Sequence, residues 1–274
     1  MSETPRRPLT APGAPSSVLR GRALVTGGTS GLGLEFARAL AARGLSLVLV
    51  ARNPERLEKT ADQLRWRYGV EVETLVADLA TRDDVDAVAA RLSDDASPVD
   101  VLVNNAGHGV HVPLLAEDLT EHHRSLDVMV RAVLVLGNAA GRSMVTRGHG
   151  AIINVASVAG RVPMGAYSAI KSWVDTYSES LSIELAGTGV QATSLLPGWV
   201  RTEFHERAQI RTTAIPDFLW LEADSVVAAA LDDVERGKVR SVPSKRFGVL
   251  AFLAAHAPRP VVRRATAMIR GGRS

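Results

Sequence analysis

Short apolar runs alternate with longer segments of helical periodicity along most of this 274-residue chain. The apolar runs are rich in Val, Leu and Ile and alternate little with polar residues, which indicates strands buried on both faces of a sheet. We predict six strands at residues 23–27, 45–51, 70–77, 99–105, 150–157 and 190–198, and a weaker seventh at 238–243. The helical periods predict helices at residues 32–43, 54–68, 83–95, 117–147, 166–186 and 223–236.

This alternation predicts an α/β fold, a single doubly wound parallel sheet of the Rossmann type with helices on both faces. Ligands of such sheets bind beyond the carboxyl ends of the strands, and the polar motifs of this chain follow those ends. We expect one domain at residues 21–243. A flexible leader rich in Pro, Ser and Ala precedes it at residues 1–20, and a C-terminal extension follows at 244–274.

The first predicted strand runs into a glycine-rich turn, TGGTSGLG at residues 26–33, and then into an amphipathic helix. Glycines at these spacings permit a tight turn and a close approach of the backbone to a pyrophosphate. This position favours a dinucleotide, with a methyltransferase as the competing class. The second strand ends at Arg52 instead of the carboxylate that holds a free ribose hydroxyl, which favours NADP over NAD.

The stretch YSAIK places Tyr167 and Lys171 four residues apart, on one face of a predicted helix. A neighbouring ammonium favours a phenolate, so we expect Lys171 to lower the pKa of Tyr167. Tyr167 would then donate and accept a proton nearer neutral pH. The alternative interpretation is two solvated side chains on an amphipathic helix, and the other motifs must decide.

Four separated motifs resemble those of the short-chain dehydrogenases/reductases, over roughly residues 20–205. They are TGGTSGLG, NNAG at residues 104–107, Ser157 ahead of YSAIK, and PGWVRT at residues 197–202. The resemblance implies that Tyr167 is the general acid or base, that Lys171 binds the nicotinamide ribose, and that Ser157 polarises the substrate oxygen. Hydride transfer leaves an alkoxide, and a hydroxyl and a phenol are suitable donors to that charge.

The resemblance also implies the cofactor site, with Asp78 at the adenine and residues 197–202 around the nicotinamide. The implied cofactor-binding residues are Gly27, Thr29, Ser30, Gly31, Leu32, Gly33, Arg52, Asp78, Leu79, Asn104, Ala106, Gly107, Tyr167, Lys171, Pro197, Gly198, Val200 and Thr202.

The chain departs from the family pattern in two places. Met129 stands about where the family often has an Asn that holds a water for the proton relay, and a thioether cannot replace that amide. Nine residues separate Ser157 from Tyr167, fewer than the family usually has, so the reach of Ser157 to the substrate is in question. Asn154 is a candidate substitute donor.

Residues 203–222 interrupt the alternation where the family usually places a substrate lid. The segment is apolar for a connection, with Phe204, Ile210, Ile215, Phe218, Leu219, Trp220 and Leu221. These side chains favour a lipophilic small-molecule substrate, or else they pack the lid onto the domain.

Composition excludes several classes of site. Without cysteine the chain can form neither disulfides nor a cysteine-ligated zinc site, and no histidine pair has the HExxH spacing, so we predict no metal. The leader lacks the apolar core of a signal peptide. The longest apolar run near the other end, residues 247–257, is shorter than the ~20 residues that span a bilayer. We therefore expect a cytoplasmic protein with no transmembrane helix.

Charge is uneven along the chain. The net charge is +3, yet no acidic residue follows Glu235, while ten basic residues do. The extension predicts two short basic, amphipathic helices broken at Pro258 and Pro260. These could lie on an anionic membrane surface, or dock on the acidic domain or on another subunit. With Phe247 and Phe252 as its aromatic residues and no recognised nucleic-acid-binding module, the extension does not indicate nucleic-acid binding.

The leading hypothesis is an NADP-dependent oxidoreductase that interconverts a ketone and a secondary alcohol on a lipophilic molecule, with Tyr167 as acid and base. The alternative is a non-catalytic dinucleotide-binding sensor or scaffold, motivated by Met129, the short loop and the basic extension. The two long predicted helices, 117–147 and 166–186, could pair across a two-fold axis in a homodimer or homotetramer, as in many members of the family, or the C-terminal extension could cover that surface.

Overall fold

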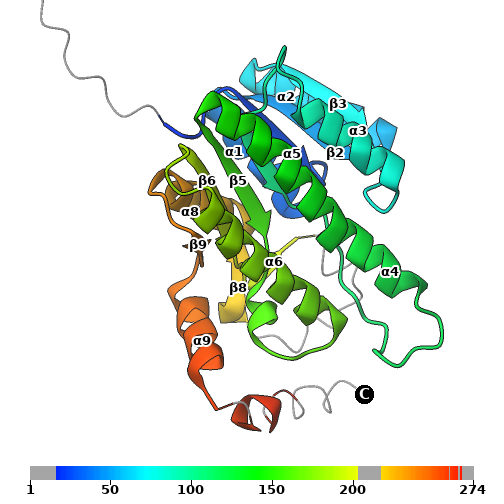
Figure 1. Cartoon of the computed structure of the whole chain (residues 1–274), viewed down its shortest axis with the longest axis vertical. Helices are drawn as coiled ribbons and strands as arrows, with labels where there is room; N and C mark the ends of the chain where they lie inside the picture. Colours follow the sequence, from blue (N-terminus) through cyan, green and yellow to red (C-terminus); the bar gives the residue numbers. More distant parts are fainter. Residues whose placement is uncertain (1–16, 203–216, 259, 265, 267–274) are drawn as a thin grey trace, which may run out of the picture.

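The computed structural model describes residues 17–202, 217–258, 260–264 and 266. Its centre is a seven-stranded sheet in the order β3-β2-β1-β4-β5-β6-β9, in which every neighbouring pair is parallel. The strands are β1 (Arg22–Thr26), β2 (Ser46–Ala51), β3 (Val72–Val76), β4 (Val101–Asn104), β5 (Gly150–Val155), β6 (Val190–Leu195) and β9 (Arg240–Ser241). The doubly wound sheet predicted from the sequence is confirmed (Figure 1).

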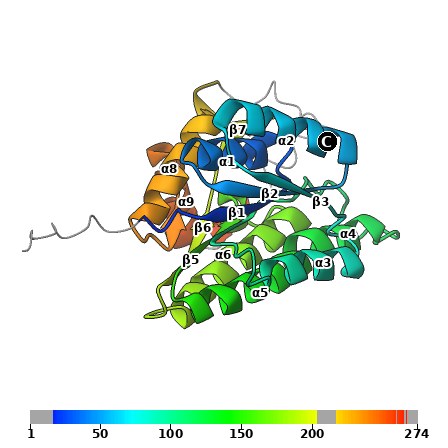
Figure 2. The same cartoon turned by 90° about the horizontal axis from the view of Figure 1, so that it is seen from above.

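Helices cover both faces of the sheet, as expected (Figure 2). One face packs against α1 (Gly31–Ala42), α2 (Pro54–Tyr68) and α8 (Ala223–Glu235). The other packs against α3 (Arg82–Leu92), α5 (Ala132–Arg147) and α6 (Ala166–Glu184). Successive strand residues alternate between the two layers, so Leu24 joins one core and Val25 the other. This double burial explains the continuous apolar runs in the sequence.

Helix boundaries follow from local sequence signals. The side chain of Asn53 accepts a hydrogen bond of 2.7 Å from the backbone N–H of Arg56, and Pro54 occupies the first turn of α2. The helix ends at Gly69, whose φ of +67° is left-handed. Together these residues fix the path of the chain from the end of β2 into α2.

The predicted helix at residues 117–147 is three segments. It begins as α4 (Thr120–Leu126), passes through a π-helical segment (Asp127–Arg131), and continues as α5. By length and composition Thr120–Arg147 could cross a membrane, but half of its most apolar window is buried in the protein. It packs against α3 and α6, so we regard it as a core helix.

The predicted strand at residues 190–198 is too long. β6 ends at Leu195, two residues before Pro197, which cannot donate to a strand ladder. The chain then forms a second, two-stranded parallel sheet from β7 (Trp199–Arg201) and β8 (Trp220–Glu222). This small sheet joins the two ends of the expected lid, whose residues 203–216 lie outside the described part of the chain.

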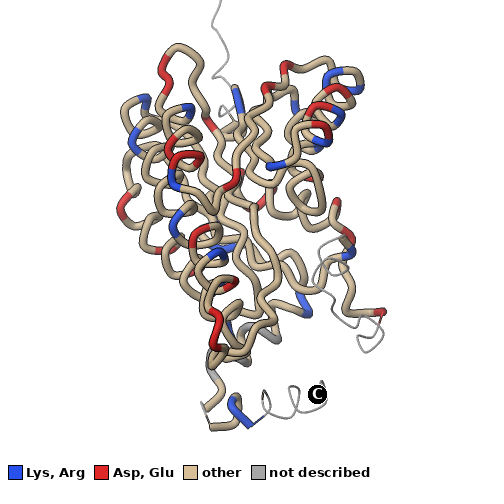
Figure 3. The backbone as a smooth tube through the Cα atoms, turned by 90° about the vertical axis from the view of Figure 1, so that its right-hand side faces the viewer, with Lys and Arg blue, Asp and Glu red and all other residues tan. Residues whose placement is uncertain are grey.

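Residues outside the predicted domain boundaries pack against the domain at both ends. Leu19 is buried and Val18 packs against the same core, so the last residues of the predicted leader belong to the domain, whereas residues 1–16 lie outside the described residues. At the other end, α9 (Lys245–His256) packs beyond the carboxyl ends of the strands (Figure 1). Residues 260–264 are helical again, with Pro260 at the start of this second helix. All charged residues described in this extension are basic (Figure 3).

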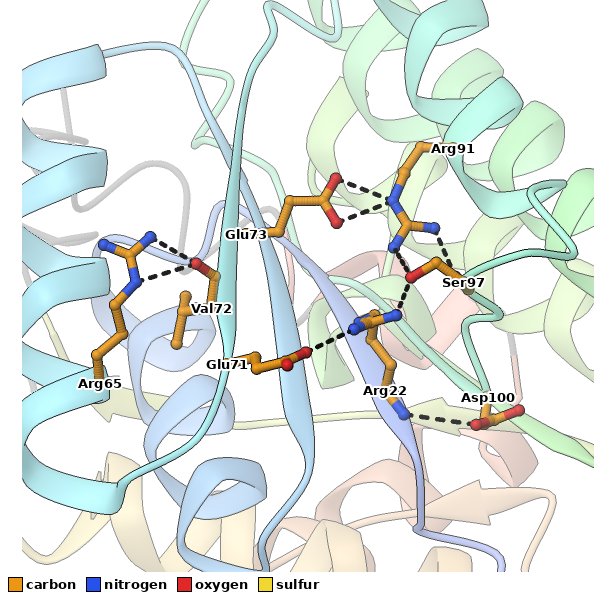
Figure 4. Close-up of polar contacts among 8 residues, drawn as sticks. All are labelled: Arg22, Arg65, Glu71, Val72, Glu73, Arg91, Ser97 and Asp100. Atoms are coloured by element: carbon orange, nitrogen blue, oxygen red, sulfur yellow. Dashed lines mark hydrogen bonds and ion pairs between the residues drawn. The ribbon is translucent and has the colours of Figure 1, made fainter.

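Ion pairs tie the amino ends of the strands together (Figure 4). The guanidinium of Arg22 in β1 lies 3.0 Å from the carboxylate of Glu71, and Arg91 in α3 lies 2.9 Å from that of Glu73. The backbone N–H of Arg22 also donates to Asp100 at 3.4 Å. These contacts stabilise the amino ends of the strands. The polar motifs lie at the opposite, carboxyl ends, where ligands would bind.

Candidate active site

The shortened loop still brings Ser157 to Tyr167. Ser157 begins a short 3-10 helix, η2 (Val158–Arg161), and its Oγ accepts a hydrogen bond of 3.1 Å from the backbone N–H of Ala159. Its side chain also hydrogen-bonds to that of Tyr167, at the start of α6. Two hydroxyl groups therefore lie together beyond the end of β5, in the arrangement that the motifs indicate.

Lys171 lies one helical turn after Tyr167 and is almost completely buried. Its ammonium donates a 2.7 Å hydrogen bond to the carbonyl of Val155, the last residue of β5. The ammonium nitrogen lies 5.8 Å from the centre of the Tyr167 ring. The end of β5 therefore holds the positive charge beside the phenol.

The expected lowering of the Tyr167 pKa is wrong for the protein alone. Burial raises the pKa of Tyr167 to about 12, and the hydrogen bond with Ser157 only partly opposes this. Burial also lowers the pKa of Lys171 to about 8. Desolvation is the largest cause of the shift for both groups, so the loss of water around them outweighs their proximity. Tyr167 is therefore a neutral phenol at neutral pH, and it can donate a proton.

The buried amine predicts an unusual dependence of stability on pH. Below pH 8 Lys171 is charged in both the folded and the unfolded chain, so the full cost of burying the charge is present. Between pH 8 and 10.5 the unfolded chain binds more protons, so we expect the free energy of unfolding to rise with pH. At about 1.4 kcal/mol per pKa unit, the contribution is on the order of 3 kcal/mol.

Urea denaturation between pH 7 and 10 should show this rise, and Lys171→Met should remove it. Above pH 10 the raised pKa of Tyr167 acts with the opposite sign, since the folded chain then holds the proton longer. An identical pH dependence in the wild type and in Lys171→Met would contradict the assignment.

Met129 fills the space beside Lys171. It lies in the π-helical segment and is fully buried. A Cβ added at Gly107 would lie 3.0 Å from the Met129 sulfur and 3.7 Å from the Lys171 ammonium, so the three residues are neighbours. The end of the NNAG motif therefore lies near Lys171, while the thioether of Met129 offers only a weak acceptor there.

Asn154 cannot replace Ser157 as a donor to substrate. It is fully buried, its side-chain oxygen accepts a 2.9 Å hydrogen bond from Asn104, and its side-chain nitrogen donates one of 3.0 Å to Ser178. Asn154 thus uses its amide to join β4, β5 and α6. The suggestion that it is a substitute donor is wrong, because both ends of the amide already have partners inside the protein.

The glycine turn fits a pyrophosphate. Gly27 and Gly31 have left-handed φ angles of +67° and +53°, and a Cβ added at Gly33 would lie 2.3 Å from the carbonyl oxygen of Gly27. The backbone N–H groups from Gly31 to Gly33 lie in the first turn of α1, where a helix leaves its amides without intrahelical partners and can bind an anion. The side chain of Leu32 packs against the core, so Leu32 contributes only its backbone to the proposed phosphate site.

Asn105, which the sequence analysis missed, holds this turn in place. Its side chain donates a 2.9 Å hydrogen bond to the carbonyl of Thr26, and its backbone N–H donates one of the same length to the Thr26 hydroxyl. The hydroxyl also accepts the N–H of Ala106 at 3.0 Å. The NNAG motif thus supports the glycine turn from β4, and its second Asn was the available signal.

The PGWVRT motif joins the serine loop to the glycine turn. The carbonyl of Pro197 accepts a 3.1 Å hydrogen bond from the N–H of Val158, beside Ser157. At the other end, a Cβ added at Gly31 would lie 3.5 Å from the Cβ of Thr202. Between them, the side chain of Val200 is buried in β7. The motif therefore spans the distance between the hydroxyl pair and the proposed phosphate site.

Gly198 meets the C-terminal extension. A Cβ added there would lie within 2.4 Å of the ring of Phe247, which is buried. The first turn of α9 therefore packs against the loop that the family resemblance places at the nicotinamide. The sequence analysis treated the extension as separate from the site. The aromatic residue Phe247 was the signal in the sequence that could have indicated this contact.

Asp78, which the family resemblance places at the adenine, pairs with a residue of α4. Its carboxylate lies 3.0 and 3.1 Å from the guanidinium of Arg124 in α4. Desolvation acts to raise the pKa of Asp78, but hydrogen bonds from the Ala80 N–H and from Arg124 outweigh it, so the pKa is below its usual value. Asp78 is therefore anchored to α4, and the side chain of its neighbour Leu79 is buried in the core.

Arg52 is exposed at the end of β2, beside an open pocket of about 500 Å³. Thr29, Asn53, Arg56 and Lys59 are among the residues that line this pocket. The guanidinium of Arg56 donates a 3.1 Å hydrogen bond to the carbonyl of Thr29, in the glycine turn. The sequence analysis missed Arg56, which adds a second cation where a 2′-phosphate would lie.

A family model described as short chain dehydrogenase matches residues 22–212. The chain belongs to the short-chain dehydrogenase family. It is 38% identical over 210 residues to a putative ketoacyl reductase of the granaticin polyketide synthase from Streptomyces violaceoruber, covering 73% of this chain and 75% of that protein. It is 33% identical over 189 residues to a very-long-chain 3-oxoacyl-CoA reductase from Anas platyrhynchos, covering 66% of this chain and 60% of that protein.

Among solved structures, a short-chain dehydrogenase from Sphingobium yanoikuyae in complex with NADPH is similar, with a TM-score of 0.79 and 35% identity. The match covers 84% of this chain and 92% of that chain. As a member of this family, the protein is an NAD(P)-dependent oxidoreductase that acts on CH–OH or C=O groups. The comparisons do not favour the sensor or scaffold hypothesis, nor the methyltransferase class.

Proposed function

We propose that this short-chain dehydrogenase interconverts a ketone and a secondary alcohol on a lipophilic small molecule, with Tyr167 as the acid and base. The observation that carries the proposal is the hydrogen-bonded pair of Ser157 and Tyr167 beside the buried ammonium of Lys171. Two hydroxyl donors and a fixed positive charge suit a reacting oxygen that becomes negative.

In the direction of reduction, the bound cofactor would supply the hydride. Ser157 donates a hydrogen bond to the substrate carbonyl and so holds its oxygen near Tyr167. Tyr167 gives its phenolic proton to this oxygen as the negative charge forms there. The ammonium of Lys171, held by the Val155 carbonyl, stabilises the phenolate that remains. In the reverse direction, the phenolate accepts the proton of the alcohol.

NADP is the cofactor. The related Sphingobium enzyme is in complex with NADPH, and the end of β2 carries Arg52 where an NAD site has a carboxylate. The glycine turn would hold the pyrophosphate, and the guanidinium groups of Arg52 and Arg56 would hold the 2′-phosphate. Lys171 and the PGWVRT motif would bind the nicotinamide end.

A lipophilic substrate is supported by the residues around the lid. The rings of Trp199 and Trp220 lie 6.2 Å apart in the small sheet at its base, and Phe218 is 62% exposed beside them. The names of the relatives also include reductases of ketoacyl and very-long-chain oxoacyl groups. Purified protein should oxidise NADPH with ketones of increasing chain length more efficiently than with a sugar ketone. No turnover with any ketone of this panel would contradict the proposed function.

We further propose a cytoplasmic homodimer or homotetramer whose extension contacts an anionic membrane surface. In α9, Val249, Phe252 and Leu253 follow the spacing of one helix face, and each is 55–62% exposed. Phe247, on the opposite side, is buried against Gly198. The same extension also carries four exposed cations, Lys245, Arg246, Arg263 and Arg264, which would favour an anionic surface.

Sedimentation with vesicles tests the membrane contact. The protein should sediment with vesicles containing about one third anionic lipid, and the double substitution of Phe252 and Leu253 by Ser should release it. Ile183→Ser is the matched control, since Ile183 is an exposed apolar residue on α6. If the double substitution leaves vesicle binding unchanged but dissociates an oligomer, the apolar face is a subunit interface instead.

A further inference from the structure

A buried carboxylate in α6 holds the loop that carries Ser157. Asp175 lies one turn after Lys171 and is 5% exposed. Its carboxylate lies 2.6 Å from the guanidinium of Arg161, the last residue of η2. It also accepts a 2.8 Å hydrogen bond from the Ser194 hydroxyl in β6, and it lies 3.1 Å from the guanidinium of Arg240 in β9. One side chain thus joins the catalytic loop, the catalytic helix and two strands.

The backbone of the same loop lies directly on α6. A Cβ added at Gly160 would lie 2.8 Å from the backbone nitrogen of Ser172 and 2.9 Å from the carbonyl carbon of Lys171. A residue with a side chain would push η2 away from the helix. The close backbone contact at Gly160 and the ion pair at Arg161 therefore act together, immediately after Ser157.

We propose that Arg161 and Asp175 are positioning residues that set the distance between Ser157 and Tyr167. The hydroxyl pair joins two elements, η2 and α6, and the Arg161–Asp175 ion pair joins the same two elements from the other end of η2. Because only nine residues connect Ser157 to Tyr167, the loop cannot absorb a displacement of η2. A shift of η2 therefore moves the Ser157 hydroxyl away from Tyr167. This inference rests on the proposed function, because its effect is on turnover.

The ion pair between Arg161 and Asp175 is largely shielded from water. The side chain of Arg161 is 23% exposed and that of Asp175 is 8% exposed, so water cannot readily replace either partner. Arg240 supplies a second cation to the same carboxylate and also lies 2.9 Å from Glu179. Removal of Arg161 therefore leaves Asp175 paired, and the local charge balance within α6 survives while the loop is released.

The chain offers a matched pair of substitutions. Arg161→Met and Arg240→Met each remove one cation from Asp175, but only Arg161 belongs to the serine loop. We expect Arg161→Met to lower kcat by about 10–100-fold, the scale of a misplacement near 1 Å, with little change in the dissociation constant of NADPH. Arg161→Lys should recover part of kcat. Arg240→Met should lower the melting temperature but leave kcat within about twofold of the wild type.

A double-mutant cycle with Ser157→Ala separates positioning from a general structural role. If Arg161 acts through Ser157, Arg161→Met should change single-turnover rates far less in the Ser157→Ala background than in the wild type. An equal loss in both backgrounds, or equal losses of kcat for Arg161→Met and Arg240→Met, would overturn the inference. Absence of turnover in the wild type would instead contradict the proposed function, so the two failures are distinguishable.

Discussion

Tyr167→Phe is expected to lower kcat by about 10²–10⁴-fold, the usual contribution of a positioned acid or base. Phenylalanine keeps the ring that packs beside Lys171 but removes the hydroxyl that donates the proton and hydrogen-bonds to Ser157. Because the amine of Lys171 keeps its bond to the Val155 carbonyl, the dissociation constant of NADPH should change only a few-fold. Steady-state kinetics with the best ketone and a fluorescence titration with NADPH measure the two quantities.

Tyr177→Phe is the matched control on the same helix. Burial also raises the pKa of Tyr177 to about 12, and its ring stacks on Trp173 with centres 5.0 Å apart. Since Tyr177 lies almost three turns from Tyr167, the loss of its hydroxyl should leave kcat within about twofold. Full activity of Tyr167→Phe, or an equal loss in both variants, would remove Tyr167 from the mechanism.

Gly33→Ala is expected to destabilise the fold and to abolish measurable NADPH binding. The added methyl group would lie 2.3 Å from the carbonyl oxygen of Gly27 and 2.4 Å from the side-chain nitrogen of Asn105. Both groups are held by the hydrogen bonds that join the turn to β4, so the turn itself must move. Overpacking of this kind costs about 1–3 kcal/mol, and it displaces the first turn of α1 from the phosphate site.

Gly141→Ala is the control for a methyl group added to a glycine. Gly141 is buried within α5, and the added Cβ would meet the Ile152 side chain at an ordinary 3.7 Å. Because alanine favours a helix by up to about 1 kcal/mol over glycine, this variant should be at least as stable as the wild type. Thermal unfolding and NADPH titration compare the two, and wild-type NADPH affinity in Gly33→Ala would rule out the phosphate site.

The sequence was sufficient wherever the signal is local. The strand-to-helix rhythm predicted the sheet, and the glycine spacing predicted a turn that the structure forms with left-handed Gly27 and Gly31. The pair Tyr167 and Lys171 lies on one helix, so their spacing alone placed them together. The sequence analysis was less accurate at boundaries, such as the end of β6 and the π-helical segment around Met129, because those depend on packing.

The sequence by itself therefore determined the family, the fold and the group of Ser157, Tyr167 and Lys171. Only the tertiary structure decided that the pKa of Tyr167 rises, that both ends of the Asn154 amide have partners inside the protein, and that Arg161 pairs with Asp175. The physical reason is that local spacing sets which side chains share a turn or a helix face. Desolvation and the choice of hydrogen-bond partner depend on segments far apart in the chain, and they become fixed only when the sheet and both helix layers exclude water.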